Sequence, residues 1–259
     1  MGPVRRARRP RLRDTRDRLL DAAERLFAER GIQGVSLREV VRAAGARNAT
    51  AVHFHFRSKD GLLRAVVARR MDALSAERID GLRRVAAAAG DAPPDLRAVV
   101  DAALRPTVRR LADPHGPAGR GWTSYLVLLA RVGIEPGIRP HELATPAFFE
   151  SSTLLVELVK RALPDVPTNL LVHRLFFAID FLAHTVAHMA RLAAESAAAA
   201  DPTILERFTE ELIDFTVGGL AAAPRATDVR TSPARTRSAR RAAPAVLLGL
   251  AGLRTGGRS

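Results

Sequence analysis

Residues Ser36–Lys59 read SLREVVRAAGARNATAVHFHFRSK and decide the fold of the N-terminal part of the chain. Ser36 and Glu39 have the S-x-x-E spacing of a capping box, which satisfies two backbone amides at a helix start. Gly45 stands where a left-handed C-cap ends that helix. Asn48 can cap a second short helix, which must end before Ser58 starts another. Two short helices joined by a tight turn form the geometry that places the second helix in the major groove of DNA.

The residues before and inside this stretch predict a small three-helix domain. From Thr15 onward, apolar residues recur on one helical face until Gly31 ends the pattern. Val52 and Phe56 are the predicted core positions of the third helix. Four neighbours lie nearer the outer surface of that helix: Thr50, Ala51, His53 and His55.

The polar and aromatic side chains of Ser36–Lys59 suit contacts with DNA. The start of the second helix of such a pair usually meets base edges, whereas cations and hydroxyls at helix starts bind phosphates. Taken singly, each of these side chains fits a solvated cap or a surface position equally well, but their order between helix signals favours DNA. The candidate DNA-binding residues are Ser36, Arg38, Arg47, Asn48, Thr50, Ala51, His53, Phe54, His55 and Lys59. Among them we expect the polar groups of residues 47–50 to read bases, and Ser36, Phe54, His55 and Lys59 to hold the DNA backbone.

Composition predicts an all-α protein. Apolar residues make up 47% of the chain and aromatic residues 5%, and no alternation of period two persists. Cys is absent, which excludes disulfides and Cys-ligated zinc and suits a reducing cytoplasm. We expect a cytoplasmic location, because no apolar run reaches the roughly 20 residues that span a bilayer. No apolar segment of an export signal follows the Arg-rich start either.

The formal charge of +14 is concentrated at the two ends of the chain. Residues 1–14 contain six Arg and one Asp, and residues 224–259 contain eight Arg and one Asp, so the segment between them is nearly neutral. We therefore predict a disordered basic arm over 1–14 and a disordered Arg-rich tail over 224–259. Such tails either bind phosphates or stay solvated without a defined partner. The short apolar run Ala242–Leu253 lies inside the tail and is left unassigned.

Residues 61–223 carry the helical pattern of a larger second domain. Pro106 interrupts one amphipathic segment without changing its phase, which predicts a kink rather than an end. With the three helices of residues 15–60, the whole chain is expected to have about nine. The predicted helical segments of the second domain are 58–89, 95–111, 122–132, 144–163, 168–200 and 201–220.

Thr15–Lys59 resembles the DNA-binding domain of the tetracycline-repressor (TetR) family of bacterial regulators. The matching pieces are AAERLFAERG, SLREVVRAAG and HFHFRSKDGLL. The resemblance implies a homodimer whose two recognition helices enter successive major grooves of a palindromic operator. It also implies that residues 61–223 bind a small-molecule effector, dimerise through the last two long helices, and release DNA when the effector binds. The expected function is that of a transcriptional regulator, usually a repressor, with no enzymatic activity and no cofactor.

The sequence departs from the family pattern at three points. His53 stands where the family commonly has the first aromatic residue of the recognition helix. The turn ARNAT is one residue longer than usual, which resembles a subgroup with Arg-Asn in this loop and shifts the expected register by about one residue. Val41 replaces a small residue, which predicts a packing change only.

The second domain holds two sets of candidate effector-binding residues. Aromatic side chains of the segments 122–132 and 144–163 suit a pocket for a largely apolar effector, although core packing explains them equally well. On the long helix 168–200, a stripe of mixed polarity contains Asp180, His184 and His188 at i, i+4 and i+8. That triplet fits a metal site, a polar anchor in a pocket, or an interface. The candidate effector-binding residues are Trp122, Tyr125, Phe148, His173, Phe177, Asp180, Phe181, His184 and His188.

Two alternative functions come from other classes of protein. A metal-dependent enzyme would use Asp180, His184 and His188, but the sequence has no other catalytic motif, such as G-x-S-x-G or H-E-x-x-H. A non-specific DNA-binding or membrane-associated protein would rely on the Arg-rich ends. We assign no metal-binding residues.

Overall fold

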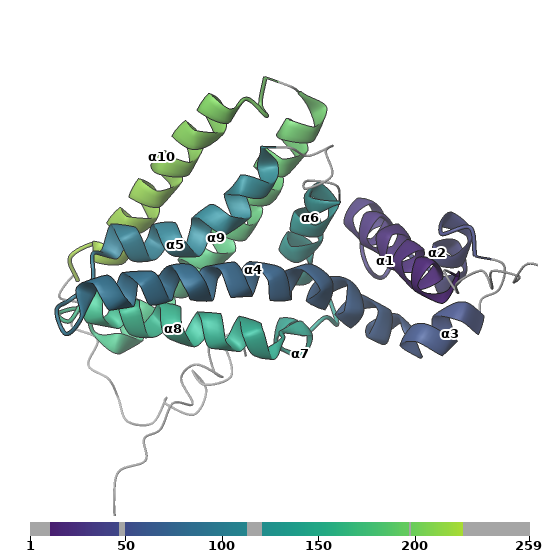
Figure 1. The fold of residues 1–259 in the computed structure, drawn as a ribbon, viewed down its shortest axis with the longest axis horizontal. Coiled ribbons are helices and arrows are strands. Elements are labelled where there is room, and N and C mark those ends of the chain that lie inside the picture. The colour runs from purple at the N-terminus through teal and green to yellow at the C-terminus, as the bar shows by residue number, and fades with distance from the viewer. Residues whose placement is uncertain (1–10, 47–49, 113–120, 197, 225–259) are drawn as a thin grey trace, which may run out of the picture.

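The computed structural model describes residues 11–46, 50–112, 121–196 and 198–224, and every regular element within these ranges is a helix (Figure 1). The described ranges hold ten α-helices and one 3₁₀ turn, against the nine or so that the sequence predicts. The additional helix is α7 (Pro140–Leu143), which starts in a predicted loop because the fixed φ of Pro140 suits a first helical position. Residues 1–10 of the predicted arm and 225–259 of the predicted tail lie outside the described ranges.

Three helices form the N-terminal domain at one end of the molecule: α1 (Arg11–Arg30), α2 (Leu37–Ala43) and α3 (Thr50–Phe56). They enclose a core that includes Phe27 and Val40, both fully buried. Val52 and Phe56 keep 0% and 7% of their surface exposed, which confirms them as core positions of α3. The core therefore fixes which face of α3 points outward.

The 31-residue helix α4 (Lys59–Ala89) belongs to both domains. It begins after Ser58, whose hydroxyl accepts a hydrogen bond from the Gly61 amide at 3.0 Å. Its first turns contribute Leu62 and Val66 to the N-terminal core, and later turns contribute Leu82 to a second core. Figure 1 shows α4 running from α3 to the far end of the C-terminal domain. A movement of α4 in one domain therefore reaches the other.

The C-terminal domain surrounds the second half of α4. Helices α5 and α8 pack against α4, α10 packs against α5 and α9, and α6 lies between α1 and α9. Helix α5 continues through Pro106, as the phase of its apolar stripe predicts. The bounds are α5 (Leu96–Val108), the 3₁₀ turn η1 (Arg109–Leu111), α6 (Trp122–Val132), α8 (Pro146–Ala162), α9 (Thr168–Glu195) and α10 (Pro202–Ala221).

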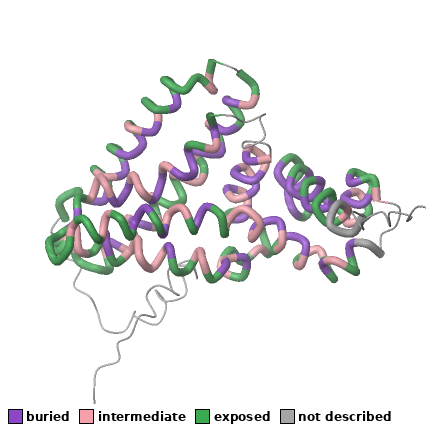
Figure 2. Tube along the Cα trace, in the orientation of Figure 1, coloured by how far each residue is buried: buried purple, intermediate pink, exposed green. Residues whose placement is uncertain are grey.

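The last two helices bury only one side of their apolar surface. Exposed positions alternate with buried ones along α10, as Figure 2 shows, and the same alternation occurs along α9. Phe177 of α9 and Phe215 of α10 are 64% and 65% exposed, and the rings of Phe181 and Phe215 lie 4.9 Å apart. Exposed apolar side chains gathered on two neighbouring helices form a candidate surface for contact with another molecule.

A buried carboxylate joins the two domains. Glu24 of α1 is 2% exposed, and its Oε2 lies 3.0 Å from Nη2 of Arg69 and 2.9 Å from Nε of Arg70, both on α4. Nη2 of Arg70 also donates to Oε1 of Glu24 at 3.0 Å, so this pair has two parallel hydrogen bonds. Charge-assisted bidentate bonds of this kind fix geometry as well as contribute energy. Glu24 therefore sets how α1 sits on α4.

Replacing Glu24 with Gln should lower the free energy of unfolding by about 3 kcal/mol, because two half-buried guanidinium groups lose the buried carboxylate that pairs with both. Urea unfolding followed by circular dichroism measures the effect. Asp21→Asn is the matched control: Asp21 pairs with the same Arg69, but its side chain is 67% exposed, so the expected loss is under about 1 kcal/mol. Equal losses for the two variants would contradict the role given to burial.

Candidate nucleic-acid interface

The start of α2 is held by a complete capping box. The Ser36 hydroxyl accepts a hydrogen bond from the Glu39 amide, while the Glu39 carboxylate accepts one from the Ser36 amide at 2.8 Å. The Ser36 hydroxyl also donates to that carboxylate at 2.8 Å, so a direct phosphate contact by Ser36 requires this proton to be redirected. Arg38, one step further along α2, is exposed.

The Ser36 hydrogen bonds, together with Arg30 at 2.7 Å, lower the pKa of Glu39 from 4.5 to about 2. A depressed carboxyl pKa stabilises the folded state fully above the ordinary value of 4.5, and this stabilisation is lost progressively as the pH falls from there through about 2. The cap of α2 is therefore fully formed at neutral pH.

Helix α3 presents an aromatic and imidazole surface to solvent. Phe54 is 72% exposed, His53 is exposed, and His55 is half-buried with its ring 5.0 Å from that of Phe54. Nδ1 of His53 lies 2.9 Å from the carbonyl oxygen of Arg57. Arg57 has a φ of 65°, which a side-chain hydrogen bond of this kind helps to hold. The turn between α3 and α4 therefore fixes the orientation of the His53 ring.

Lys59 is the first residue of α4 and follows closely after the end of α3. Its side chain is half-buried, and Nζ donates to the Gln33 carbonyl at 3.4 Å. That distance is long for a hydrogen bond, and the ammonium group has two further N–H donors. Lys59 thus keeps the capacity for a phosphate contact.

The structure places six of the ten candidate DNA-binding side chains on three neighbouring helices: Ser36, Arg38, His53, Phe54, His55 and Lys59. Thr50 and Ala51 form the first turn of α3, and their side chains are not described. Arg47 and Asn48 lie outside the described residues.

The candidate effector-binding residues do not converge on one cavity. Trp122 and Tyr125 are buried at 6% and 0%, whereas Phe148 is half-buried beside Phe149. The remaining candidates are all exposed along α9: His173, Phe177, Asp180, Phe181, His184 and His188. Nδ1 of His184 is 2.9 Å from the Asp180 carbonyl and 3.8 Å from its carboxylate. No cluster of three or more metal-binding side chains occurs among the described residues.

The tryptophan of α6 sits in an electrostatic stack that the sequence pattern does not reveal. The guanidinium carbons of Arg70 and Arg110 lie 4.9 and 5.0 Å from the centre of the Trp122 ring. Arg70 also binds Glu24, and Arg110 pairs with Glu77 of α4. Cations over an indole face are attracted by its quadrupole. The stack therefore links α1, α4, η1 and α6.

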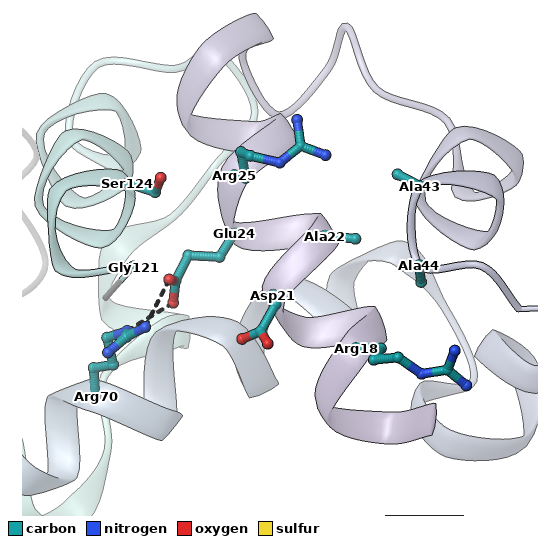
Figure 3. A pocket seen from close by; sticks show the side chains of 10 residues that line it. All are labelled: Arg18, Asp21, Ala22, Glu24, Arg25, Ala43, Ala44, Arg70, Gly121 and Ser124. Carbon is teal, nitrogen blue, oxygen red and sulfur yellow. Dashed lines mark hydrogen bonds and ion pairs between the residues drawn. The ribbon is translucent and has the colours of Figure 1, made fainter. Parts of the chain in front are cut away.

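A cavity of about 480 Å³ lies where α1, α2, α4 and α6 meet (Figure 3). Figure 3 shows the Glu24 carboxylate pointing to Arg70 beside Gly121, the residue just before α6. Gly121 has a φ of 81°, and a Cβ there would lie 2.6 Å from the Glu24 carboxylate. Only glycine combines this backbone conformation with so close an approach. The lining residues are Arg18, Asp21, Ala22, Glu24, Arg25, Ala43, Ala44, Arg70, Gly121 and Ser124.

The other end of α6 also contacts the N-terminal domain. Nε of Arg131 donates to the Ala28 carbonyl at 2.9 Å. Just beyond α6, the Glu135 carboxylate accepts from the Gln33 amide at 2.8 Å. Helix α6 is thus tied to the N-terminal domain at both ends while its flank packs on α9.

The role of Glu24 does not follow from the local sequence pattern, although Glu24 lies inside the piece AAERLFAERG. The only local indication of a buried role is that Glu24 lies between the apolar positions Ala23 and Leu26. A charged side chain next to a buried apolar stripe usually has a buried partner. Its partners Arg69 and Arg70 lie 45 and 46 residues further along the chain.

Comparisons with known proteins match both domains. Residues 19–66 match the model of bacterial regulatory proteins of the tetR family, and residues 101–219 match the tetracyclin repressor-like C-terminal domain. The HTH-type transcriptional repressor ComR of Escherichia coli (strain K12) is 41% identical over 69 residues, which cover 27% of this chain and 32% of that protein. The chain thus matches about a third of the length of this curated relative.

A solved structure is similar over nearly its whole length. The fatty acid degradation regulator FadR from Bacillus halodurans superposes with a TM-score of 0.54 at 14% identity, covering 79% of this chain and 98% of that one. At this identity the similarity shows that the two chains share a fold.

Gly121→Ala should lower the free energy of unfolding by about 2 kcal/mol or more, because it forces a left-handed non-glycine residue and displaces Glu24 or Arg70. The emission of Trp122, the only tryptophan, should shift at the same time as the Arg70 stack is disturbed. Gly133→Ala, at the other end of α6, is the control: its φ is −67° and the nearest atom to a new Cβ is 3.7 Å away. Unchanged stability and emission in Gly121→Ala would refute the close packing described.

Proposed function

This chain belongs to the tetR family of bacterial regulatory proteins, and we propose that it is a homodimeric repressor that binds a palindromic operator and leaves it when a small-molecule effector binds. The regulators of this family are soluble cytoplasmic DNA-binding proteins, and we propose the same location for this chain. The observation that carries the proposal is the outward face of α3, where Phe54 and His53 are exposed although Val52 and Phe56 anchor the helix in the core.

The proposed division of roles follows from the position of each residue on α2, α3 and α4. The first turn of α3 with the preceding turn, residues 47–51, would meet base edges, as the starts of recognition helices do. Phe54 would pack on sugar or a thymine methyl, and His55 would donate to the groove wall. Arg38 would reach a phosphate or a guanine edge, and Lys59 a phosphate.

The apolar face of α9 and α10 supports a dimer of two copies of this chain. Helix α9 is long and apolar enough to cross a membrane, yet only 22% of its most apolar stretch of 18 residues is buried within one chain. Because α9 also packs against α6 and α10 in the helical domain, we propose that a second copy, rather than lipid, covers it. Its exposed polar residues His173, Asp180, His184 and His188 would then lie in or beside the dimer interface.

Two connections would carry the effector signal to DNA. Helix α4 extends from the second core to Lys59, and α6 contacts α1 through residues at both of its ends. A ligand that shifts either helix within the C-terminal domain would turn α1 and, with it, α3. The coupling needed between the two sites is typically about 1–3 kcal/mol.

Selection of random duplex DNA with the full-length protein tests the proposal. We expect a palindromic consensus with half-sites roughly one helical turn apart, and a match to it in the DNA upstream of the protein's own gene. A variant lacking residues 225–259 should select the same consensus. Selection of no consensus, or loss of most affinity on removal of the tail, would favour non-specific binding through the Arg-rich ends.

Lys59→Ala should weaken binding to all DNA sequences alike and reduce the slope of log affinity against log salt by about one unit, because one phosphate contact is lost. Fluorescence anisotropy at several salt concentrations measures both quantities. Thr50→Ala should instead change the sequence preference and keep the salt slope. Lys160→Ala on α8, which removes the only other lysine, should do neither. The reverse pattern for Lys59 and Thr50 would show that α3 is rotated relative to the proposed docking.

Phe177→Glu combined with Phe215→Glu should convert the dimer to a monomer without unfolding it, since both side chains are exposed within one chain and charges there oppose apolar association. Light scattering coupled to size exclusion reports the mass. Ile134→Glu, at an exposed apolar residue elsewhere (68%), is the control and should remain dimeric. A dimeric double variant would place the interface on another face.

A further inference from the structure

A buried hydroxyl on α4 lacks a hydrogen-bond partner. Ser75 is 0% exposed, and its Oγ has no partner in the described structure. Buried serine and threonine side chains in helices usually bond to a backbone carbonyl one turn earlier. Ser151, Thr209 and Thr216 do so, at 2.6 to 3.0 Å. Leaving a buried hydroxyl unpaired costs free energy, so Ser75 needs a separate explanation.

One turn further along α4, Arg78 reaches into the same domain without an acidic partner. Its Nε donates to the Ala103 carbonyl at 3.0 Å, and its Nη2 donates to Oγ1 of Thr107 at 2.9 Å. Both acceptors are neutral. A guanidinium has five N–H donors, and the other three, two on Nη1 and one on Nη2, find no acceptor among the described residues. The edge that binds a carboxylate in a bidentate manner therefore remains available.

Two other arginines of the C-terminal domain, Arg105 and Arg110, are neutralised by carboxylates. Arg105 binds Asp101, Glu206 and Glu210, and Arg110 pairs with Glu77. Arg78 differs from them because the atoms around it desolvate the guanidinium and lower its pKa. Arg78 is partly exposed, and a cation that is partly withdrawn from water is stabilised when an anion pairs with it.

The surroundings of Arg78 do not provide that anion. Tyr125 of α6 is the titratable group that acts on Arg78 electrostatically, and burial raises the pKa of Tyr125 so that it stays neutral. Its hydroxyl is 3.2 Å from the Val67 carbonyl, to which it donates. The second core, to which α4 and α5 both contribute, includes Leu74, Leu82, Leu104 and Val108.

We propose that Ser75 and Arg78, supported by Thr107, anchor the carboxylate of an otherwise apolar small-molecule effector inside the C-terminal domain. The free edge of the guanidinium would hold the two carboxylate oxygens, and the Ser75 hydroxyl would donate to one of them. The apolar core around α4, α5 and α6 would take the remainder of the molecule. This inference rests on the proposed function, in which residues of the C-terminal domain bind an effector.

The position of Arg78 also connects such a ligand to DNA binding. The hydrogen bonds from Arg78 to Ala103 and Thr107 hold α4 against α5, and the same α4 begins at Lys59. A carboxylate that draws the guanidinium toward itself changes the α4–α5 contact directly. The acid therefore acts on the helix that reaches the proposed DNA interface.

Calorimetric titration of the full-length protein, without DNA, tests this site. The probes are decanoate and 4-phenylbutyrate, each compared with its primary amide, which keeps the shape but not the charge. At least one acid should bind about tenfold or more tightly than its amide, because a charge-assisted bidentate pair is lost with the amide. No binding of either acid, or equal binding of acid and amide, would overturn the proposal. Operator selection is a separate experiment, so failure there leaves this result readable.

Variants test whether Ser75 and Arg78 cause the preference for the acid over its amide. Arg78→Met should abolish the preference for the acid, and Arg78→Lys should keep a weaker preference, because it retains the charge but loses the fork. Ser75→Ala should weaken acid binding severalfold without lowering the unfolding midpoint, since it removes an unpaired hydroxyl. Arg84→Met, at an exposed arginine of the same helix, should bind like the wild type. If Arg78→Met fails to fold, Arg78→Lys and Ser75→Ala decide the question. Acid binding that is unchanged in both of these variants would overturn the assignment.

Discussion

The buried pairing of Glu24 with Arg69 and Arg70 is the interaction on which the arrangement of the two domains depends. Glu24 belongs to the core of a small domain that must present α3 to DNA, and the two arginines belong to α4, which the other domain encloses. Because the carboxylate is 2% exposed, the pair is little screened by salt. Gly121 lies against the same pair and brings the start of α6 into it. One carboxylate thus fixes the positions of α1, α4 and the start of α6 relative to one another.

Three regions with different roles follow one another along α4. One end carries Lys59 beside the outward face of α3, and the middle holds the pair to Glu24. The later turns carry Ser75 and Arg78 among the apolar side chains of the second core. Helix α10 lies across α5 from α4 (Figure 1) and packs against α5 and α9. The proposed ligand site, the domain junction and the proposed DNA-facing end therefore share the helix α4, whereas the proposed dimer interface lies on α9 and α10.

The local part of this structure could be predicted from the sequence, and the long-range part could not. The capping box of Ser36 and Glu39, the core positions Val52 and Phe56, and the continuation of α5 through Pro106 follow from spacing along one helix. The exposure of the face of α9 that carries Phe177 and His184 could not be predicted. Helix α9 is apolar on more than one side, and periodicity does not show which apolar side faces the core of the chain and which faces another molecule. The roles of Glu24 and Arg78 depend on residues tens of positions away, which no local pattern contains.

The spacing of the two N-terminal domains in the proposed dimer tests the central role of Glu24 most directly. The chain has no cysteine, so Ala43→Cys at an exposed position of α2 gives one spin label per protomer for electron–electron distance measurement. With Glu24 present, we expect a single narrow distance distribution between the two labels, because the carboxylate fixes α1 on α4. With Glu24→Gln added, under conditions where circular dichroism shows both proteins folded, the distribution should broaden markedly. Distributions of equal width would contradict the claim that this buried pair sets the position of the DNA-facing domain.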